Sequence, residues 1–267
     1  MAVRDSAGSG REGEEPTLVK SAERTVRIVE ALAASPTRLT LTELQEVLGY
    51  PRSSLHALVR TLRELKWVES DEAGLAFGVG PHALLSGTAY LDRDPALRVA
   101  VRTLEDLRDE LGFTSHYARR DDGHVLYLAT RESRQPVVAI QRVGRRLPVH
   151  ITALGQALLA DLTPAEVSTL LPPTLEAHTP RSLTDHAALA AELDQVRSRG
   201  WAFESQQGTE GVACVAAVVG YRIPATDAIS CAMPADLATP ERVRQVGQTV
   251  VAHAARLAVA LRREGIR

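Results

Sequence analysis

The stretch LTLTELQEVLGYPRSSLHALVRTL, residues 39–62, decides the fold of the first part of the chain. Thr40 and Glu43 have the spacing of a capping box, in which a hydroxyl and a carboxylate satisfy free backbone amides at a helix start. Gly49 suits the left-handed residue that ends a helix, and Pro51 suits the first turn of the next one. The stretch therefore predicts two short helices joined by a tight turn.

Apolar residues repeat at helical spacing in both predicted helices and define the faces that we expect to be buried. They are Leu44, Val47 and Leu48 in the first helix and Leu55, Leu58, Val59 and Leu62 in the second. An earlier helix, beginning near residue 21, carries Val26, Val29, Leu32 and Ala33 in the same pattern. A short helix, a tight turn and a second helix make the helix-turn-helix pattern.

The outward face of the second helix is rich in hydrogen-bond donors and positive charge. Residues 51–66 contain four basic residues and one acidic residue, whereas residues 17–80 contain eight of each. Because the net charge of the whole chain is −2, any attraction to nucleic acid must be local, as it is here. The predicted DNA-binding residues are Arg52, Ser53, Ser54, His56 and Arg60, with Thr42 of the preceding helix. The alternative is a solvated polar face without a partner.

A resemblance to a known family becomes specific at residues 66–80, KWVESDEAGLAFGVG, which predict two short strands around a turn at residues 71–74. A hairpin directly after the second helix makes a winged helix. Residues 21–70 then resemble the N-terminal domain of the IclR family of bacterial transcriptional regulators. The resemblance implies binding to double-stranded operator DNA. The wing lacks the basic and aromatic residues usual at its tip, so we expect its contacts to DNA to be weak.

Three later segments resemble the same family: residues 143–160, residues 199–219 and residues 227–237. The resemblance implies a GAF-like domain that binds a small organic effector, often a carboxylic acid. Carried over position by position, it implies an effector pocket. The expected pocket residues are Thr152, Ala153, Gly155, Glu204, Cys214 and Ser230.

The chemistry of these residue types agrees with a pocket. Ala153 and Gly155 permit the backbone to approach a ligand closely. Backbone amides at the start of the helix after Thr152 are suited to hold a carboxylate, because that helix end carries free donors and partial positive charge. Two alternatives stay open: Cys214 is an ordinary buried thiol, and Gly155 serves only helix packing.

Several positions depart from the family pattern. Gln206 and Gln207 stand where acids are frequent, and Val218 replaces a common proline. Ala232 and Met233 replace a small polar residue and a glycine on the expected pocket strand. This last pair predicts a less polar and more filled cavity, and hence an effector with an apolar body.

The whole chain is expected to be α+β. The expected parts are a disordered tail over residues 1–16, a winged helix-turn-helix domain over residues 17–80, a linker helix over residues 81–95 and a GAF-like effector-binding domain over residues 96–267. In the resembling family the linker helix also helps to pair subunits; a plain connector is the alternative. We expect a homodimer or tetramer, with RNA polymerase as a further candidate partner.

Composition and missing motifs limit the other classes of function. The 267 residues, 45% apolar and 24% charged, fit a globular protein of two domains. Two cysteines, no apolar run of membrane-spanning length and no apolar leader predict a cytoplasmic protein. Motifs for catalysis, cofactors or metals are absent. A thiol-dependent enzyme that uses Cys214 with His116 or His150 remains one alternative, and a regulator without a ligand remains another.

Overall fold

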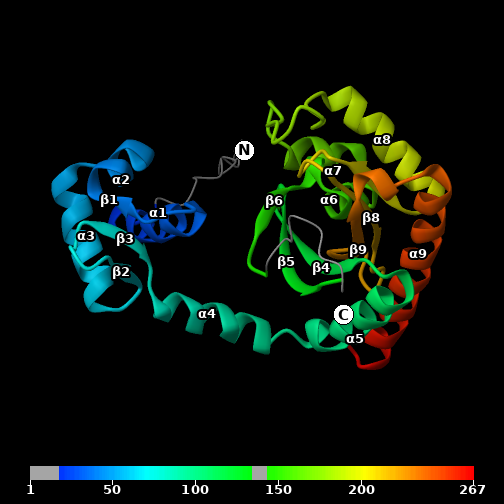
Figure 1. Cartoon of the computed structure of the whole chain (residues 1–267), viewed down its shortest axis with the longest axis horizontal. Coiled ribbons are helices and arrows are strands. Elements are labelled where there is room, and N and C mark those ends of the chain that lie inside the picture. The colour runs from blue at the N-terminus through cyan, green and yellow to red at the C-terminus, as the bar shows by residue number, and fades with distance from the viewer. Residues whose placement is uncertain (1–17, 134–142) are drawn as a thin grey trace, which may run out of the picture. The chain divides into compact units, whose positions relative to one another are not determined.

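The computed structural model describes residues 18–133 and 143–267, and Figure 1 shows how its helices and strands are arranged. These residues form two compact units, one ending at Ala89 and the other spanning Tyr90–Arg267. The tail predicted over residues 1–16 lies outside the described residues.

The N-terminal unit is a winged helix-turn-helix, as predicted. Its helices are α1 (Lys20–Ala34), α2 (Leu41–Leu48) and α3 (Arg52–Glu64). Its strands are β1 (Leu39–Thr40), β2 (Val68–Ser70) and β3 (Ala76–Val79), in the order β1-β3-β2. Helices α2 and α3 are the two consecutive short helices that residues 39–62 predict. The hairpin of β2 and β3 follows α3 directly and forms the wing.

Local signals set the boundaries of α2. The backbone N–H of Glu43 donates to the Thr40 hydroxyl, and the Glu43 carboxylate accepts from the backbone N–H of Thr40 at 2.7 Å. Both halves of the capping box are therefore present. Gly49 ends the helix with a φ of 67°, a left-handed conformation that glycine adopts without steric cost.

The core of the N-terminal unit differs from the prediction at three positions, one of which is Ala33, exposed in α1. Leu55, Val59 and Leu62 of α3 are buried as expected. Val26 and Val47, however, are 57% and 65% exposed. The fully buried residues of the two earlier helices are Ile28, Leu32 and Leu44. Both helices carry more than one apolar stripe, and contact between helices decides which stripe is buried.

Helix α4 (Pro81–Asp92) crosses the division between the two units. None of its side chains is buried, and Leu84 and Leu85 are 69% and 64% exposed. The linker helix predicted over residues 81–95 is therefore shorter than expected: it ends at Asp92, residues 93–94 form a break, and Pro95 begins α5.

The C-terminal unit is built on a six-stranded antiparallel sheet in the order β6-β5-β4-β9-β8-β7. The strands are β4 (Thr114–Asp121), β5 (His124–Arg131), β6 (Arg146–Pro148), β7 (Ala202–Ser205), β8 (Val212–Val218) and β9 (Asp227–Pro234). The helices are α5 (Pro95–Leu111), α6 (Ala153–Ala160), α7 (Pro164–Leu170), α8 (His186–Arg199) and α9 (Pro240–Arg263), with short 3-10 helices η1 (Val149–Ile151) and η2 (Ala235–Leu237). This is the α+β arrangement expected of a GAF-like domain.

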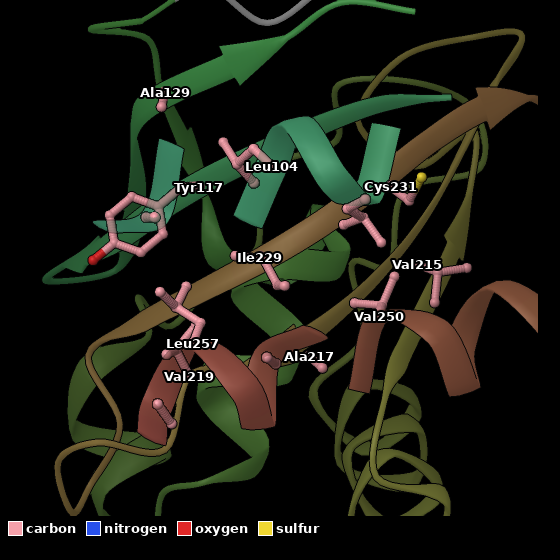
Figure 2. Packing of buried hydrophobic residues seen from close by; sticks show 14 of the residues in the cluster. Leu104, Tyr117, Ala129, Val215, Ala217, Val219, Ile229, Cys231, Val250 and Leu257 are labelled. Atoms are coloured by element: carbon pink, nitrogen blue, oxygen red, sulfur yellow. The ribbon is translucent and has the colours of Figure 1, made fainter. Parts of the chain in front are cut away.

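Apolar side chains cover both faces of this sheet. Helices α5 and α9 pack on one face, where Figure 2 shows Ile229 and Cys231 of β9 close to Val250 and Leu257 of α9. Helices α6 and α8 pack on the other face. Because successive residues of a strand point to opposite faces, each strand contributes alternately to the two cores.

Across residues 18–133 and 143–267, no helix combines the length and apolar character needed to cross a membrane.

Candidate functional sites

The outward face of α3 presents the residues that the sequence singles out. Arg52, Ser53, His56 and Arg60 are exposed, and Ser54 is half-buried. They lie opposite the buried stripe of α3, since residues that share a helix face recur every three or four positions. The structure therefore leaves donor side chains available along one side of the helix.

Two contacts fix this face relative to the other helices. The Arg52 guanidinium donates from Nη1 to Thr42 Oγ1 of α2 at 3.4 Å. Arg24 of α1 donates from Nη1 to Ser54 Oγ at 3.3 Å, and its guanidinium lies 5.1 Å from the centre of the Tyr50 ring. The sequence analysis missed Arg24, because a contact between residues thirty positions apart leaves no short-range pattern.

The tip of the wing carries acidic rather than basic side chains. Asp71 accepts hydrogen bonds from the backbone amides of Leu75 and Ala76, and these bonds lower its pKa. Glu72 is exposed beside it, and Leu75 is 68% exposed. The wing tip thus lacks the positive charge that would favour contact with phosphates.

An enclosed cavity of about 30 Å³ lies between the sheet and the start of α6 in the C-terminal unit. Five of the six predicted pocket residues line it, namely Thr152, Ala153, Glu204, Cys214 and Ser230. They come from α6 or its N-cap, β7, β8 and β9. Residues separated by almost eighty positions therefore meet at one small space.

Gly155 lies outside this lining and has a packing role. A Cβ atom at position 155 would fall 2.2 Å from the carbonyl oxygen of Val149, which is far inside van der Waals contact. Its backbone N–H donates to Thr152 Oγ1 at 3.0 Å, which caps α6. The glycine therefore lets α6 pack directly against the preceding segment.

Among the described residues that line the cavity, Glu204 is the one with an acidic side chain. It is 4% exposed, and its carboxylate accepts from the backbone N–H of Gln207 at 2.8 Å. Burial raises the pKa of Glu204 to about 7. Burial and the neighbouring Glu204 also raise the pKa of the Cys214 thiol well above its ordinary value. A thiol in this state is a poor nucleophile, because the thiolate is the reactive form.

His116 and Tyr127, from β4 and β5, also contribute polar side chains to the lining and were not among the predicted pocket residues. His116 Nδ1 lies 3.0 Å from Thr130 Oγ1, and its ring meets the Tyr127 ring edge-on with 5.3 Å between the centroids. Burial lowers the pKa of His116 to about 4, so the imidazole is neutral at physiological pH. Within the sheet, His116 pairs directly with Ser230 of β9.

The start of α6 supplies backbone donors to the cavity. Ala153 and Leu154 line it and occupy the first two positions of the helix, where amides have no intrahelical acceptor. None of the described residues lining the cavity is Lys or Arg. An anion in this space would therefore depend on backbone amides and neutral side-chain donors.

One expectation about the pocket strand needs correction. Ala232 lines the cavity, but Met233 belongs to the core on the opposite face of the sheet. Consecutive strand residues cannot share a face, so only one of the pair affects the cavity. Gln207 lies behind the lining, where its side-chain oxygen accepts from Gln156 Nε2 at 2.8 Å.

Over the same described residues, no three His, Cys, Asp or Glu side chains gather closely enough to hold a metal ion.

Comparison with known proteins decides the family. Residues 88–259 match the family described as Bacterial transcriptional regulator IclR C-terminal, and residues 21–72 match the IclR helix-turn-helix domain. The chain belongs to the IclR family of bacterial transcriptional regulators. The N-terminal unit of this IclR-family regulator is accordingly its DNA-binding domain.

Individual relatives agree with this assignment. The HTH-type transcriptional regulator BhcR of Paracoccus denitrificans is 32% identical over 217 residues, which are 81% of this chain and 77% of that protein. The crystal structure of an IclR transcriptional regulator from Alicyclobacillus acidocaldarius is 26% identical, with a TM-score of 0.78 over 91% of this chain and 99% of that chain. An IclR homologue from Microbacterium hydrocarbonoxydans, complexed with 4-hydroxybenzoate, shares the fold at 23% identity, with a TM-score of 0.71 over 90% of this chain and 99% of that chain.

Proposed function

We propose that this IclR-family regulator reads operator DNA with the outward face of α3. The residues assigned to this contact are Arg52, Ser53, Ser54, His56 and Arg60, with Thr42 of α2. In a helix-turn-helix the early residues of the second helix reach base edges in the major groove, while basic side chains contact phosphates. Exposure of four of these side chains on one face supports the assignment.

The regulator is proposed to act as a homodimer or tetramer on a roughly palindromic operator. Paired α3 helices on one DNA face require half-sites about 10 bp apart or at multiples of that spacing. We place the protein in the cytoplasm, with RNA polymerase as a further candidate partner. Its role is regulatory rather than catalytic, and the raised pKa of Cys214 supports this over thiol catalysis.

The cavity of the C-terminal unit is proposed to bind a small organic effector, with a carboxylic acid as the expected class. The proposal rests on the convergence of Thr152, Ala153, Glu204, Cys214 and Ser230 around one enclosed space. The free amides at the start of α6 suit a carboxylate. Ala232, Tyr127 and the neighbouring apolar side chains suit an apolar body. A relative with this fold is complexed with 4-hydroxybenzoate, an acid of that kind.

The cavity must widen to admit such a molecule. A volume of about 30 Å³ holds about two water molecules, whereas pockets for organic ligands measure roughly 300–1,000 Å³. We infer that the effector favours a wider arrangement of the cavity walls than the one described. A shift of this kind would change the affinity for the operator.

Titration calorimetry with a panel of aromatic and aliphatic acids, including 4-hydroxybenzoate, tests the effector site. At least one acid should bind the wild type, and Ser230→Ala should weaken that acid by roughly 5- to 15-fold, as expected for the loss of one hydrogen bond. Ser198→Ala, an exposed serine of α8, is the matched control and should bind like the wild type. Absence of heat with every acid, or equal weakening by both variants, would contradict the site.

A further inference from the structure

A buried ion-pair cluster joins the sheet of the C-terminal unit to the end of α4. Arg119 of β4 donates to Asp227 of β9 at 2.6 Å from Nε and at 3.1 Å from Nη2. Its Nη1 donates to Asp94 at 2.5 Å and to the Tyr90 hydroxyl at 3.4 Å. Tyr90 lies in the last turn of α4, so one guanidinium connects two strands with the linker helix.

The carboxylates of this cluster are held firmly. The Asp227 side chain is fully buried, and it also accepts from the hydroxyls of Tyr117 (2.6 Å) and Tyr221. The Asp94 side chain is 6% exposed and caps α5 by accepting from the amides of residues 96 and 97. Buried pairs with every polar atom bonded have one preferred geometry, because a displaced partner would leave a charge unpaired. Movement of one member is therefore passed on to the others.

The same two strands carry the effector cavity. His116 pairs with Ser230 in the β4–β9 register, and Arg119 pairs with Asp227 three positions further along. Three residues span about 10 Å of strand. The two pairs lie on opposite faces, since Arg119 follows Tyr117 on the side covered by α5 and α9, where Figure 2 shows Tyr117. Cavity and ion-pair cluster thus share one rigid, hydrogen-bonded strand pair.

We propose that Arg119 is a positioning residue that transmits widening of the cavity to α4. The inference rests on the proposed effector site and identifies its route to the linker. Widening displaces β4 and β9 at His116 and Ser230. The shift moves Asp227 and Arg119, and the guanidinium then carries Asp94 and Tyr90 with it. The N-terminus of α5 and the last turn of α4 change position together, and α4 leads by chain connectivity to the DNA-binding unit.

The test uses a side chain in place of an effector. Ala232→Leu enlarges a residue that lines the cavity and should push its walls apart. Asp94→Asn removes the ion pair on the linker side and leaves Arg119 only its longer contact of 3.4 Å with the Tyr90 hydroxyl. Asparagine caps a helix as well as aspartate does but carries no charge for Arg119. Asp121→Asn is the matched control, since it removes a half-exposed ion pair with Arg146 from the same strand β4 and leaves every partner of Arg119 in place.

The readout is hydrogen exchange of the backbone amides of residues 85–97 in the full-length protein. In the wild-type and Asp121→Asn backgrounds, Ala232→Leu should change their exchange rates by about 2- to 30-fold, the range expected for coupling along such a path. In the Asp94→Asn background the change should largely disappear, because only the longer contact with Tyr90 remains. If Arg119 had a purely structural role, Asp94→Asn would change the exchange rates of residues 85–97 by itself. Ala232→Leu would then change these rates by the same factor with and without Asp94→Asn.

Two results would overturn the proposal. One is that Ala232→Leu leaves residues 85–97 unaffected in the wild-type background. The other is that its effect persists in the Asp94→Asn background. If Ala232→Leu does not fold, Ala232→Val provides a smaller enlargement with the same expectations. Because no effector is used, failure here is distinct from failure of the calorimetric test of the cavity.

Discussion

Arg24 of α1 and Ser54 of α3 are joined by a hydrogen bond of 3.3 Å between Nη1 and Oγ. The bond places a guanidinium of the first helix at the edge of the face proposed to read DNA. It also accounts for the partial burial of Ser54, because one side of its hydroxyl is taken up within the domain. The proposed DNA-binding surface therefore draws on α1 as well as on α2 and α3.

Arg24→Ala should weaken binding to operator and random DNA by similar factors. We expect the guanidinium, at the edge of this face, to contact the DNA backbone, and a phosphate contact carries no sequence information. Its loss should reduce the slope of log affinity against log salt by about 1. Affinity measured over a range of salt concentrations gives this slope. Arg27→Ala, an exposed arginine paired with Glu30 on the same helix, should keep the wild-type slope. Equal slopes for Arg24→Ala and the wild type would remove Arg24 from the surface.

Glu204→Gln should change how stability depends on pH. Burial raises the pKa of Glu204 from 4.5 to about 7, so folding favours its protonated form. The resulting stabilisation is complete below pH 4.5 and is lost as the pH rises through 7. The glutamine of the variant cannot ionise, so the variant does not lose stability in this way as the pH rises. Its free energy of unfolding, relative to wild type, should therefore rise by roughly 1–3 kcal/mol between pH 4.5 and pH 8.

The prediction concerns the difference in free energy of unfolding between the variant and the wild type at each pH. The wild type alone is not sufficient, because His116 makes stability depend on pH in the opposite direction. Its pKa is lowered by burial to about 4, so its contribution is lost as the pH falls from 6.5 through 4. Urea unfolding at matched protein concentration supplies the free energies, with Glu241→Gln on the exposed part of α9 as control. A difference that stays flat or falls as the pH rises would show that Glu204 is ionised at an ordinary pKa.

Gly155→Ala should destabilise the C-terminal unit by about 3 kcal/mol. The added methyl group would collide with the Val149 carbonyl, and the backbone on both sides would have to move. Gly87→Ala is the matched control, because a Cβ at that position of α4 meets nothing within 4 Å. It should be neutral or slightly stabilising. Thermal unfolding compares the two, and a Gly155→Ala protein as stable as Gly87→Ala would contradict the packing role.

The sequence predicted best those features that depend on neighbouring residues. The capping box of Thr40 and Glu43 and the left-handed Gly49 follow from the local chain, and the structure contains all of them. The sequence did not predict which apolar stripe of α1 and α2 is buried, and Val26 and Val47 are exposed. Only contact with the other helices decides which stripe is buried.

The residues that line the cavity likewise include some that were predicted and some that were not. Its residues on α6, β7, β8 and β9 came from a family resemblance, whereas His116 and Tyr127 lie on a hairpin far away in the chain. A hairpin is visible in the sequence, but the sheet order that brings it beside β9 is not. Since Ala232 faces the cavity, strand alternation alone predicts that Met233 points to the opposite face of the sheet.

The central claim, that the outward face of α3 reads base pairs, is tested most directly by Arg52→Ala in quantitative footprinting. An operator selected from random DNA by the wild-type protein serves as the specific site, and Arg98→Ala in α5, also exposed, controls for loss of one positive charge. We predict that Arg52→Ala lowers the ratio of operator to random-DNA affinity by roughly 5- to 150-fold, the equivalent of about 1–3 kcal/mol. An unchanged ratio in Arg52→Ala would contradict the claim.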